Sequence, residues 1–366
     1  MNNHTSHLLA PYGWDSGFAE DFFPYADRGL LPARIVRVDR GRCDAVIAGP
    51  GGEGVLTVRA DTAPVWSPDP LRIACTGDWA ALDPDQQVVR ALLPRRTAFL
   101  RSASSKKSEG QVLAANVDHA LIAVSLAAEP DLGRIERFLA LAWESGARPL
   151  VVLTKTDVVP DASGLAYLIA DTEATAPGVD VHAVSAVTGE GMHVLAASLG
   201  GGTAVLLGQS GAGKSTLANA LLGEDVQEVR STRDSDGKGR HTTTTRDLLP
   251  LPGGGVLIDT PGLRGVGLWD AEAGVGQVFA EIEVLARACR FHDCAHTVEP
   301  GCRVMEALES GELPERRLES YRKLLRENER LAARTDARLR AEIRRDWKQK
   351  QALGRHMMER KRGRYR

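Results

Sequence analysis

The sequence predicts a multidomain α/β fold. A small N-terminal β-barrel and a C-terminal helical module flank a central domain with a mostly parallel sheet and helices on both faces. Three observations predict this class: short β-like segments with frequent turns up to residue 94, alternating strands and helices up to residue 259, and a helical pattern with a cysteine cluster afterwards. A length of 366 residues also exceeds one comfortable hydrophobic core.

Bulk composition favours a folded protein outside the membrane. Hydrophobic residues make up 43% of the chain, so most of it can bury a core. No apolar run approaches the roughly 18–20 residues of a membrane span, and the N-terminus lacks a basic region followed by an apolar stretch. We expect a cytoplasmic protein without a membrane partner, and a monomer.

Charge is distributed unevenly along the chain. Residues 316–366 carry 19 Lys and Arg against 7 Asp and Glu, a surplus of 12, whereas the whole chain has a net charge of −2. A basic tail on an acidic body indicates a polyanionic partner, nucleic acid first. A solvated helix that carries both charges is the alternative.

The first hundred residues divide into an extension and a barrel. Residues 1–30 contain Gly, Pro and aromatic residues without a clear period, so we expect a loosely ordered extension. Residues 31–98 contain five short β-like segments: ARIVRV, CDAVIA, GVLTVRA, LRIACTGDWAAL and QQVVRALL. This spacing predicts an OB-fold, with a generic small barrel as the alternative.

Residues 99–268 are expected to form the central domain. Residues 95–110 have the polar, basic composition of a linker, after which strands alternate with helices. We expect strands in HALIAVSL, RPLVVLT, VDVHAVSA, TAVLLG and GVLIDT, and helices over residues 132–143, 164–174 and 215–223. Ligands of such sheets bind at the carboxyl ends of the strands, so the motifs at those ends form the candidate site.

The segment GQSGAGKS, residues 208–215, fits the phosphate-loop pattern G-x-x-x-x-G-K-S and lies between a predicted strand and a predicted helix. Glycines let backbone N–H groups point at phosphate oxygens, and the helix N-terminus adds partial positive charge. Lys214 is expected to reach the β- and γ-phosphates, and Ser215 to bind Mg²⁺. The predicted phosphate-binding residues are Gly208, Gln209, Ser210, Gly211, Ala212, Gly213, Lys214, Ser215 and Thr216.

A second phosphate motif, DTPG, follows the strand GVLI about fifty residues later. Asp259 is expected to hold Mg²⁺, directly or through water, and the Gly262 N–H to meet the γ-phosphate. Between the two motifs, residues 237–246 form a Gly- and Thr-rich loop that suits a mobile lid. One of three threonines in this loop, Thr243, Thr244 or Thr245, is expected to complete the coordination shell of Mg²⁺. The sequence does not choose among them, and we take Thr244, the middle one, as the candidate.

The segment TKTD ends the strand RPLVVL and resembles the N/T-K-x-D base motif of GTPases. The Asp157 carboxylate can accept two hydrogen bonds from guanine, and adenine lacks that donor pair, so this residue would reject ATP. The Lys155 stem can pack on the base, and Thr154 replaces the commoner asparagine. The predicted base-binding residues of this motif are Thr154, Lys155, Thr156 and Asp157.

Ser185 and Ala186 end the next strand, where the Ala186 N–H can approach guanine O6. The base motif therefore precedes the phosphate loop, which reverses the ordinary order in G proteins. A circular permutation explains this order without changing the site, because chain termini usually lie at the surface and often close together.

The region 269–366 is expected to be a zinc-binding domain with a basic helical tail, with helices over residues 275–290, 303–310 and 316–362. Its pattern Cys-x4-Cys-x-His-x5-Cys supplies three thiolates and one imidazole, the ligand set of a closed structural Zn²⁺ site. Five cysteines, an odd number, argue against a disulfide framework. The predicted ligands of one Zn²⁺ per chain are Cys289, Cys294, His296 and Cys302, with His292 as a rival to His296.

Together these features resemble the ribosome small-subunit-dependent GTPase A family (RsgA, also called YjeQ) over about residues 31–310. The resemblance rests on the OB-like start, AANVD at 114–118, the permuted motif order, GRHTTTTR at 239–246 and the Cys-Cys-His-Cys cluster. It implies a GTPase that acts in late maturation of the small (30S) ribosomal subunit, with 16S-type rRNA, GTP and GDP as partners and Mg²⁺ bound with GTP. It also implies binding in the GTP state, faster hydrolysis on the particle, and release afterwards.

Two other functions remain open from the residues themselves. A GTP-regulated signalling or transport factor without an RNA partner would carry the same nucleotide motifs. A metabolic P-loop kinase would share the phosphate loop, but TKTD argues against it. Many G proteins place a glutamine that orients the attacking water directly after DTPG, but this chain has Leu263 there. We therefore expect His241, the nearest polar candidate in the Thr-rich loop, to take part in hydrolysis. A solvated loop histidine is the alternative.

Overall fold

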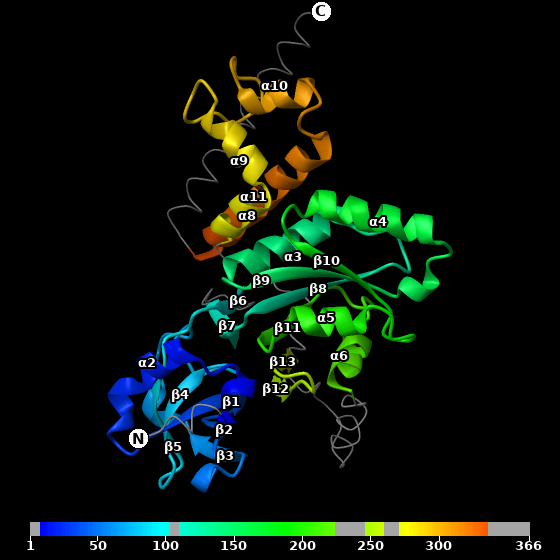
Figure 1. Ribbon diagram of the computed structural model, residues 1–366. Coiled ribbons are helices and arrows are strands. Elements are labelled where there is room, and N and C mark those ends of the chain that lie inside the picture. The colour runs from blue at the N-terminus through cyan, green and yellow to red at the C-terminus, as the bar shows by residue number, and fades with distance from the viewer. Residues whose placement is uncertain (1–7, 103–109, 224–245, 260–270, 336–366) are drawn as a thin grey trace, which may run out of the picture.

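Five N-terminal strands close into a barrel (Figure 1). The strands are β1 (Leu31–Asp39), β2 (Arg42–Ala48), β3 (Val55–Asp61), β4 (Trp79–Asp83) and β5 (Val88–Leu92). β1 pairs with both β2 and β4, β3 lies parallel to β5, and β5 pairs with β4, so the ring runs β1-β2-β3-β5-β4. This ring of five strands confirms the predicted small barrel. The computed structural model describes residues 8–102, 110–223, 246–259 and 271–335.

A helix, α2 (Ser16–Ala26), packs against this barrel. The Asp15 side chain caps the helix by accepting a hydrogen bond from the Phe18 N–H at 3.0 Å. Phe18 and Phe22 are buried with Trp14 and Trp79. Our expectation of a loosely ordered extension is therefore wrong for residues 8–30, because aromatic residues four apart on one helical face bury themselves on the barrel.

The central domain contains a six-stranded, mostly parallel portion of the sheet, as predicted. Its strands are β8 (His119–Ser125), β9 (Arg148–Thr154), β10 (Asp180–Val184), β11 (Thr203–Leu207), β12 (Asp247–Pro250) and β13 (Val256–Asp259). Their order is β10-β9-β8-β11-β13-β12, and β12 alone among them is antiparallel to its neighbour β13. The carboxyl ends of β9, β10, β11 and β13 therefore meet at one edge of the sheet.

Helices cover both faces of this sheet (Figure 1). They are α3 (Leu132–Glu144), α4 (Ala162–Thr175), α5 (Met192–Ser198) and α6 (Lys214–Leu222). Successive strand residues belong to different cores: Val205 packs on the side of α3 and α4, whereas Leu206 packs on the side of α5 and α6. The continuous apolar runs of the sequence reflect this burial on both faces.

The predicted linker, residues 95–110, contains strand structure instead. β6 (Ala98–Ser102) pairs antiparallel with β7 (Gly110–Ala115), and Phe99 is buried. The linker interpretation is wrong there because the polar residues that suggested it lie mainly at 103–109, outside the described residues. β1 also pairs with β12 through Arg37 and Asp247, so the sheet crosses from the barrel into the central domain. The domain boundaries proposed above stay predictions.

The described part of the C-terminal module contains four helices: α8 (Glu272–Val278), α9 (Ala280–Arg287), α10 (Arg303–Glu309) and α11 (Glu315–Thr335). The single helix predicted over residues 275–290 is wrong, because the chain leaves helical geometry at Phe279 (φ −112°, ψ 40°). Leu318, Tyr321 and Leu324 of α11 belong to the same core as α3. The module is thus continuous with one face of the central domain, and the predicted helix beyond residue 335 lies outside the described residues.

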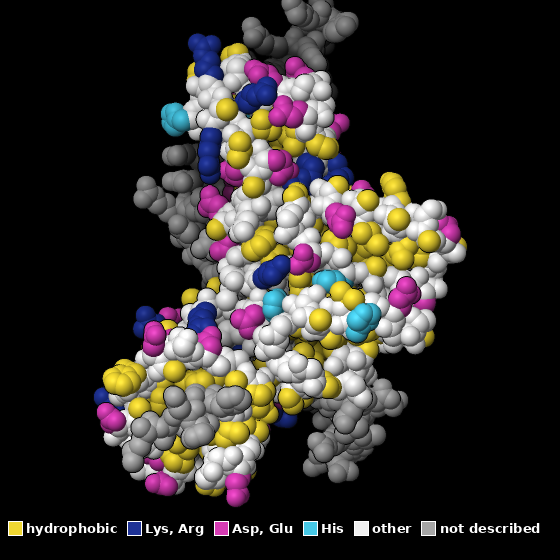
Figure 2. Space-filling view, in the orientation of Figure 1, with side chains coloured by type: hydrophobic (Ala, Val, Ile, Leu, Met, Phe, Trp, Pro, Cys, Tyr) yellow, Lys and Arg dark blue, Asp and Glu magenta, His cyan; other side chains and the backbone are white. Residues whose placement is uncertain are grey.

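The described surface of this module mixes both charges on the face in Figure 2. Residues 336–366 carry 12 Lys and Arg against 4 Asp and Glu, so most of the positive surplus lies beyond the described residues. Every helix in the described part of the chain is too short or too polar to cross a bilayer. Short 3-10 helices complete the fold at η1 (Ala10–Tyr12), η2 (Pro50–Gly52), η3 (Ala63–Val65) and η4 (Thr156–Val158).

Candidate functional site

The phosphate-loop residues curl between the end of β11 and the start of α6. Gly208 has a φ of 136°, and a Cβ there would lie 2.5 Å from the Ala123 carbonyl oxygen, so only glycine fits. Lys214 Nζ donates hydrogen bonds to the Gly208 carbonyl oxygen, at 2.8 Å, and to the Gln209 carbonyl oxygen. Ser215 and Thr216 are exposed in the first turn of α6, whose N-terminus favours anions.

The base motif lies directly against this loop. Thr154 Oγ1 donates to the Ala212 carbonyl oxygen at 2.8 Å, although the two residues are 58 positions apart in the chain. Lys155 Nζ donates to the Gly211 carbonyl oxygen at 2.9 Å, and Lys155 itself has a left-handed backbone with a φ of 63°. Two motifs in permuted order therefore form one continuous rim.

The second base segment meets the first through a short hydrogen bond. Ser185 Oγ donates to Asp157 Oδ1 at 2.6 Å, with Ser185 fully buried and Asp157 exposed. Ala186 follows Ser185 in the chain and is half-buried. Thr156 differs from the other predicted base-binding residues: its hydroxyl is buried and has no partner among the described residues.

Two of the three predicted Mg²⁺ ligands, Asp259 and Ser215, lie within the described residues. β11 and β13 are parallel with Val205 opposite Ile258, so Asp259 lies at the carboxyl end of β13 next to the phosphate loop. Asp259 and Ser215 offer the hard oxygen ligands that Mg²⁺ prefers. Gly262, Thr244 and His241 lie outside the described residues, and their roles stay predictions.

A cavity of about 400 Å³ adjoins the phosphate loop. Gln209 and Ser210 line one wall, and Arg134, Ile135 and Phe138 of α3 line the other. The N-terminal half of α3 therefore borders the nucleotide region, while its flank carries the C-terminal module.

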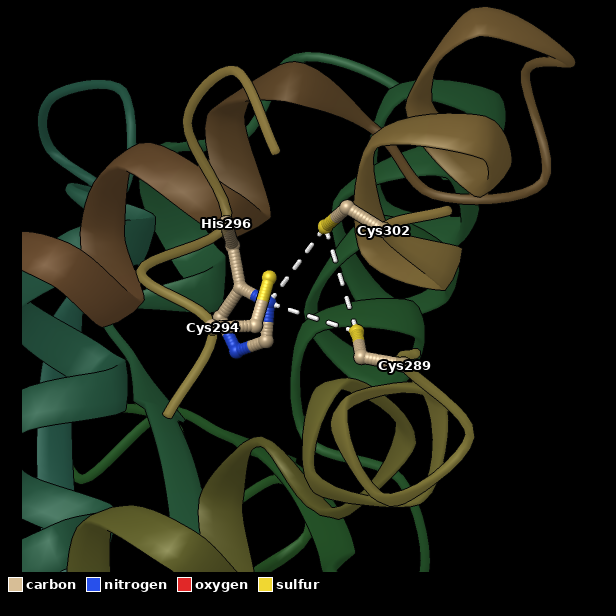
Figure 3. A group of neighbouring side chains, drawn as sticks. All are labelled: Cys289, Cys294, His296 and Cys302. Carbon is tan, nitrogen blue, oxygen red and sulfur yellow. Dashed lines mark hydrogen bonds between the residues drawn. The ribbon is translucent and has the colours of Figure 1, made fainter. Parts of the chain in front are cut away.

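The four predicted zinc ligands converge in the module (Figure 3). Their donor atoms all lie within 4.8 Å of one another. The Sγ atoms of Cys289 and Cys302 are 3.9 Å apart, and His296 Nδ1 lies 3.6 Å and 3.5 Å from them. Tetrahedral Zn²⁺ bonds of about 2.3 Å to sulfur and 2.0–2.1 Å to nitrogen place two sulfurs about 3.8 Å apart and sulfur and nitrogen about 3.6 Å apart. The distances among Cys289, His296 and Cys302 fit the ion, and the Cys294 donor lies within 4.8 Å of the other three.

The histidine of the cluster is held in place by its surroundings. His296 has a left-handed backbone with a φ of 54°, and its carbonyl oxygen accepts a hydrogen bond from Arg322 of α11. Burial lowers the pKa of His296, which favours the neutral imidazole that binds metal. The rival His292 is exposed and lies outside the cluster.

Glu299 organises the loop between the ligands, and our sequence reasoning missed it. Its carboxylate accepts hydrogen bonds from the backbone N–H groups of Ala295 (3.1 Å), Thr297 (2.8 Å) and Val298 (3.0 Å). These bonds, that from Thr297 first, lower the pKa of Glu299 to about 2. An acidic residue inside a tight loop between ligands was the available signal.

A buried ionic network joins the module to α3, and the sequence reasoning missed it too. Glu136, which is 0% exposed, accepts hydrogen bonds from Arg317 (2.7 Å), Arg316 (3.0 Å) and Ser320. Arg317 also donates to Glu281 and stacks over a phenylalanine ring. The sequence feature that could have revealed this network is Glu136, a glutamate on the otherwise apolar face of α3.

Comparisons with known proteins agree with this geometry. Residues 92–269 match a family model described as RsgA GTPase. The chain is 69% identical over 363 residues to a protein of Streptomyces avermitilis, covering 99% of this chain and 96% of that one, and 67% identical to one of Streptomyces coelicolor, covering 99% and 98%. Both relatives are named small ribosomal subunit biogenesis GTPase RsgA.

Solved structures give the same result for the fold. The chain is similar to YjeQ from Thermotoga maritima, with a TM-score of 0.61 and 27% identity over 82% of this chain and 98% of that one. It also resembles YloQ, which is described as a circularly permuted GTPase, with a TM-score of 0.58 and 20% identity over 82% of this chain and 95% of that one. The second likeness concerns the fold alone.

Proposed function

This chain belongs to the RsgA GTPase family, and from that membership we propose that it hydrolyses GTP during late maturation of the small ribosomal subunit. One observation supports the proposal most directly: Thr154 Oγ1 lies 2.8 Å from the Ala212 carbonyl oxygen. This contact brings a guanine-type motif and a phosphate loop together, despite their reversed order in the chain.

The proposed nucleotide site uses each group for a separate task. Asp157, oriented by Ser185, accepts hydrogen bonds from guanine, and the phosphate loop with Lys214 surrounds the phosphates. Mg²⁺, when bound, neutralises charge on the phosphate oxygens, with Ser215 and Asp259 as its ligands. His241 remains our proposed catalytic group.

The proposed metal in the C-terminal module is structural zinc. Three thiolates and one imidazole fill all four tetrahedral positions, so no position is left for substrate. The ion would hold the loop between α9 and α10 in a fixed shape, on the same module that packs on α3.

The proposed partner is the 30S subunit, through its 16S-type rRNA. A five-stranded barrel of this kind commonly binds oligonucleotides, and the surplus of positive charge beyond residue 335 suits RNA phosphates. Binding in the GTP state and release after hydrolysis would make the interaction a cycle. The proposal places the protein, as a monomer, in the cytoplasm with its substrate particle.

Co-sedimentation with isolated 30S subunits tests this function. We expect more protein in the pellet with a non-hydrolysable GTP analogue than with GDP, and faster GTP hydrolysis in the presence of subunits. An equal amount of 50S subunits serves as the control. If neither subunit binds or stimulates the protein, the alternative of a GTP-regulated factor without an RNA partner replaces the proposal.

A further inference from the structure

We propose that Glu299 is a positioning residue for the metal site: its carboxylate shapes the loop so that the imidazole of His296 faces the cysteine thiolates independently of the ion. The inference rests on the structural zinc proposed above and names a residue that sets its affinity. In Figure 3 the imidazole is directed toward Cys289 and Cys302, whose Sγ atoms lie 3.6 Å and 3.5 Å from its Nδ1 atom. Glu299 is not one of the four ligands, so it acts through the backbone.

Helices hold two of the four ligands. Cys289 lies two residues after α9, and its N–H donates to the Ala286 carbonyl oxygen of that helix at 3.1 Å. Cys302 is the N-cap residue of α10. His296 lies in the segment between these two helices, outside any helix or strand. Its orientation therefore depends on contacts other than those of regular secondary structure.

The backbone of His296 is itself in an unfavourable conformation. Its φ of 54° lies in the left-handed region, where the Cβ of any residue except glycine approaches a backbone carbonyl oxygen too closely. A histidine keeps this conformation only where the surrounding contacts enforce it. The direction of the imidazole therefore depends on what holds the peptide groups on either side of His296.

Glu299 holds those peptide groups. Its Oε1 atom accepts a hydrogen bond from the Ala295 N–H at 3.1 Å, and its Oε2 atom accepts from the N–H groups of Thr297 at 2.8 Å and Val298 at 3.0 Å. Ala295 precedes His296 in the chain, and the other two residues follow it. One carboxylate thus bridges both sides of the left-handed residue, with one oxygen for each side.

Arg322 of α11 supplies a second contact from outside the loop. Its guanidinium donates to the His296 carbonyl oxygen, while Leu318 and Leu324 anchor the same helix in the core. Glu299 thus fixes the shape of the loop, and Arg322 fixes its place on α11. A ligand that is already oriented loses less conformational freedom when the ion binds, so the metal affinity rises. Contacts of this kind behind a metal ligand contribute about 10-fold to 100-fold in affinity.

Competition with a chromophoric zinc chelator measures this contribution in the full chain. Glu299→Ala removes all three backbone hydrogen bonds and should weaken Zn²⁺ binding about 10-fold to 100-fold. Glu299→Gln keeps the side-chain volume, but its amide oxygen replaces only one of the two carboxylate oxygens, so the loss should be smaller, about tenfold at most. The control, Glu312→Ala, removes an exposed glutamate of the same module that binds Arg303, and it should leave the Zn²⁺ affinity unchanged.

Cobalt reports whether the loss acts through His296. Co²⁺ bound by three thiolates and one imidazole has visible absorption bands that change when the imidazole leaves. We expect that change in Glu299→Ala and not in Glu312→Ala. In a His296→Ala background, excess Co²⁺ titrates the remaining thiolates. Adding Glu299→Ala there should alter the affinity by less than about twofold, because the residue through which Glu299 acts is gone.

Each outcome decides the inference. A Glu299→Ala protein that binds Zn²⁺ as tightly as wild type overturns it. So does an equal loss with and without His296, since Glu299 would then support the loop without positioning the ligand. If Glu299→Ala does not fold, Glu299→Gln decides by the same two measurements. If the wild-type chain binds no Zn²⁺, the proposed zinc fails together with the inference, whereas wild-type binding with unaffected variants removes the inference alone.

Discussion

Thr154 shows how a single residue defines the permuted site. Its hydroxyl donates to the Ala212 carbonyl oxygen at 2.8 Å and lies 3.3 Å from the Val124 carbonyl oxygen. A hydroxyl group has one proton and therefore donates one strong hydrogen bond. The shorter contact, with Ala212 of the phosphate loop, is that bond. An asparagine would offer two donors at the same place. The residue that is less common in this motif therefore still connects the base segment to the phosphate segment.

A substitution at Asp157 tests the base assignment. Asp157→Asn should weaken GTP binding at least about tenfold, because the amide cannot accept both guanine donors, and it should favour xanthosine triphosphate, whose extra carbonyl accepts from the amide. Competition binding with GTP, ATP and xanthosine triphosphate measures this. If ATP competes as well as GTP for the wild-type protein, the assignment is wrong.

The ion pair of Asp15 and Arg96 predicts a pH dependence for the docking of α2. The Arg96 hydrogen bond lowers the pKa of Asp15 to about 2 from 3.8. The folded state therefore binds fewer protons than the unfolded state in this range, so the contribution is present above about pH 4 and is lost as the pH falls toward 2. Both side chains are about half exposed, which limits the contribution to about 1 kcal/mol.

Asp15→Asn keeps the helix cap and removes the pair. The gap in unfolding free energy between wild type and variant should narrow as the pH falls from 5 to 3, in urea unfolding followed by fluorescence. In an Arg96→Gln background the same gap should shrink, because the backbone hydrogen bond from Phe18 is then the largest remaining contact that lowers the pKa of Asp15. A gap that widens in acid would contradict the assignment.

At the scale of elements, the close approach of α8 and α3 depends on one glycine. A Cβ at Gly274 would lie 2.1 Å from the Ala140 carbonyl oxygen, and the Gly274 N–H donates to Glu144 at 2.9 Å. The two helices therefore contact each other through backbone as well as side chains. This contact packs α8, which begins at Glu272, on α3, the helix that borders the phosphate loop.

Two glycines of the same helix provide a matched test. Gly274→Ala should destabilise the protein by about 1–3 kcal/mol, because α8 must move away from α3. Gly276→Ala meets no heavy atom closer than 3.9 Å and should stabilise the protein by about 0.5–1 kcal/mol, since alanine favours helix. Chemical unfolding measures both. If the two substitutions changed the unfolding free energy equally, the close approach of α8 to α3 would not restrict the residue at position 274.

At the scale of the whole molecule, the C-terminal module is held by two independent means. The Cys/His cluster, with its proposed zinc, would fix the segment from Cys289 to Cys302, whereas α11 is held on α3 by Arg317, Glu136 and the apolar core. Loss of metal should therefore affect the two parts differently.

Chelation tests this separation. Elemental analysis should find one zinc per chain in wild type and in His292→Ala, and none in His296→Ala. After metal removal, hydrogen exchange should rise across residues 289–302 and in α10, while α11 stays protected. Uniform unfolding of everything after residue 270 would mean that the metal holds the whole module.

The basic tail predicts the salt dependence of subunit binding. Truncation after Gly311 would remove α11 and leave Glu136 buried without its partners, so the informative cut is after Thr335. That cut removes a surplus of 8 positive charges. Subunit affinity should fall and its salt slope should flatten, because fewer counterions are released, while the GTP-over-GDP ratio persists. Loss of the ratio with unchanged affinity would reverse the roles of tail and nucleotide site.

The sequence by itself determined the chemistry of this protein. Phosphate loop, base motif and Cys/His cluster are local patterns, in which residue type and short spacing suffice to specify a ligand. The strands and helices of the central domain could also be predicted from the sequence, because burial on one or both faces produces a characteristic pattern of apolar residues. His241, Thr244, Gly262 and the basic tail beyond residue 335 lie outside the described residues, and their roles remain predictions.

Only the tertiary structure decided how these parts are joined. Glu136 and Arg317 are 181 residues apart, and Asn328 and Ala271 are 57 apart, so no local period relates them. The helix on the barrel, the β6–β7 pair and the break at Phe279 were misread for the same reason. Which polar residue is buried, and which partner compensates it, depends on the packing of distant elements, and a linear pattern does not contain that information.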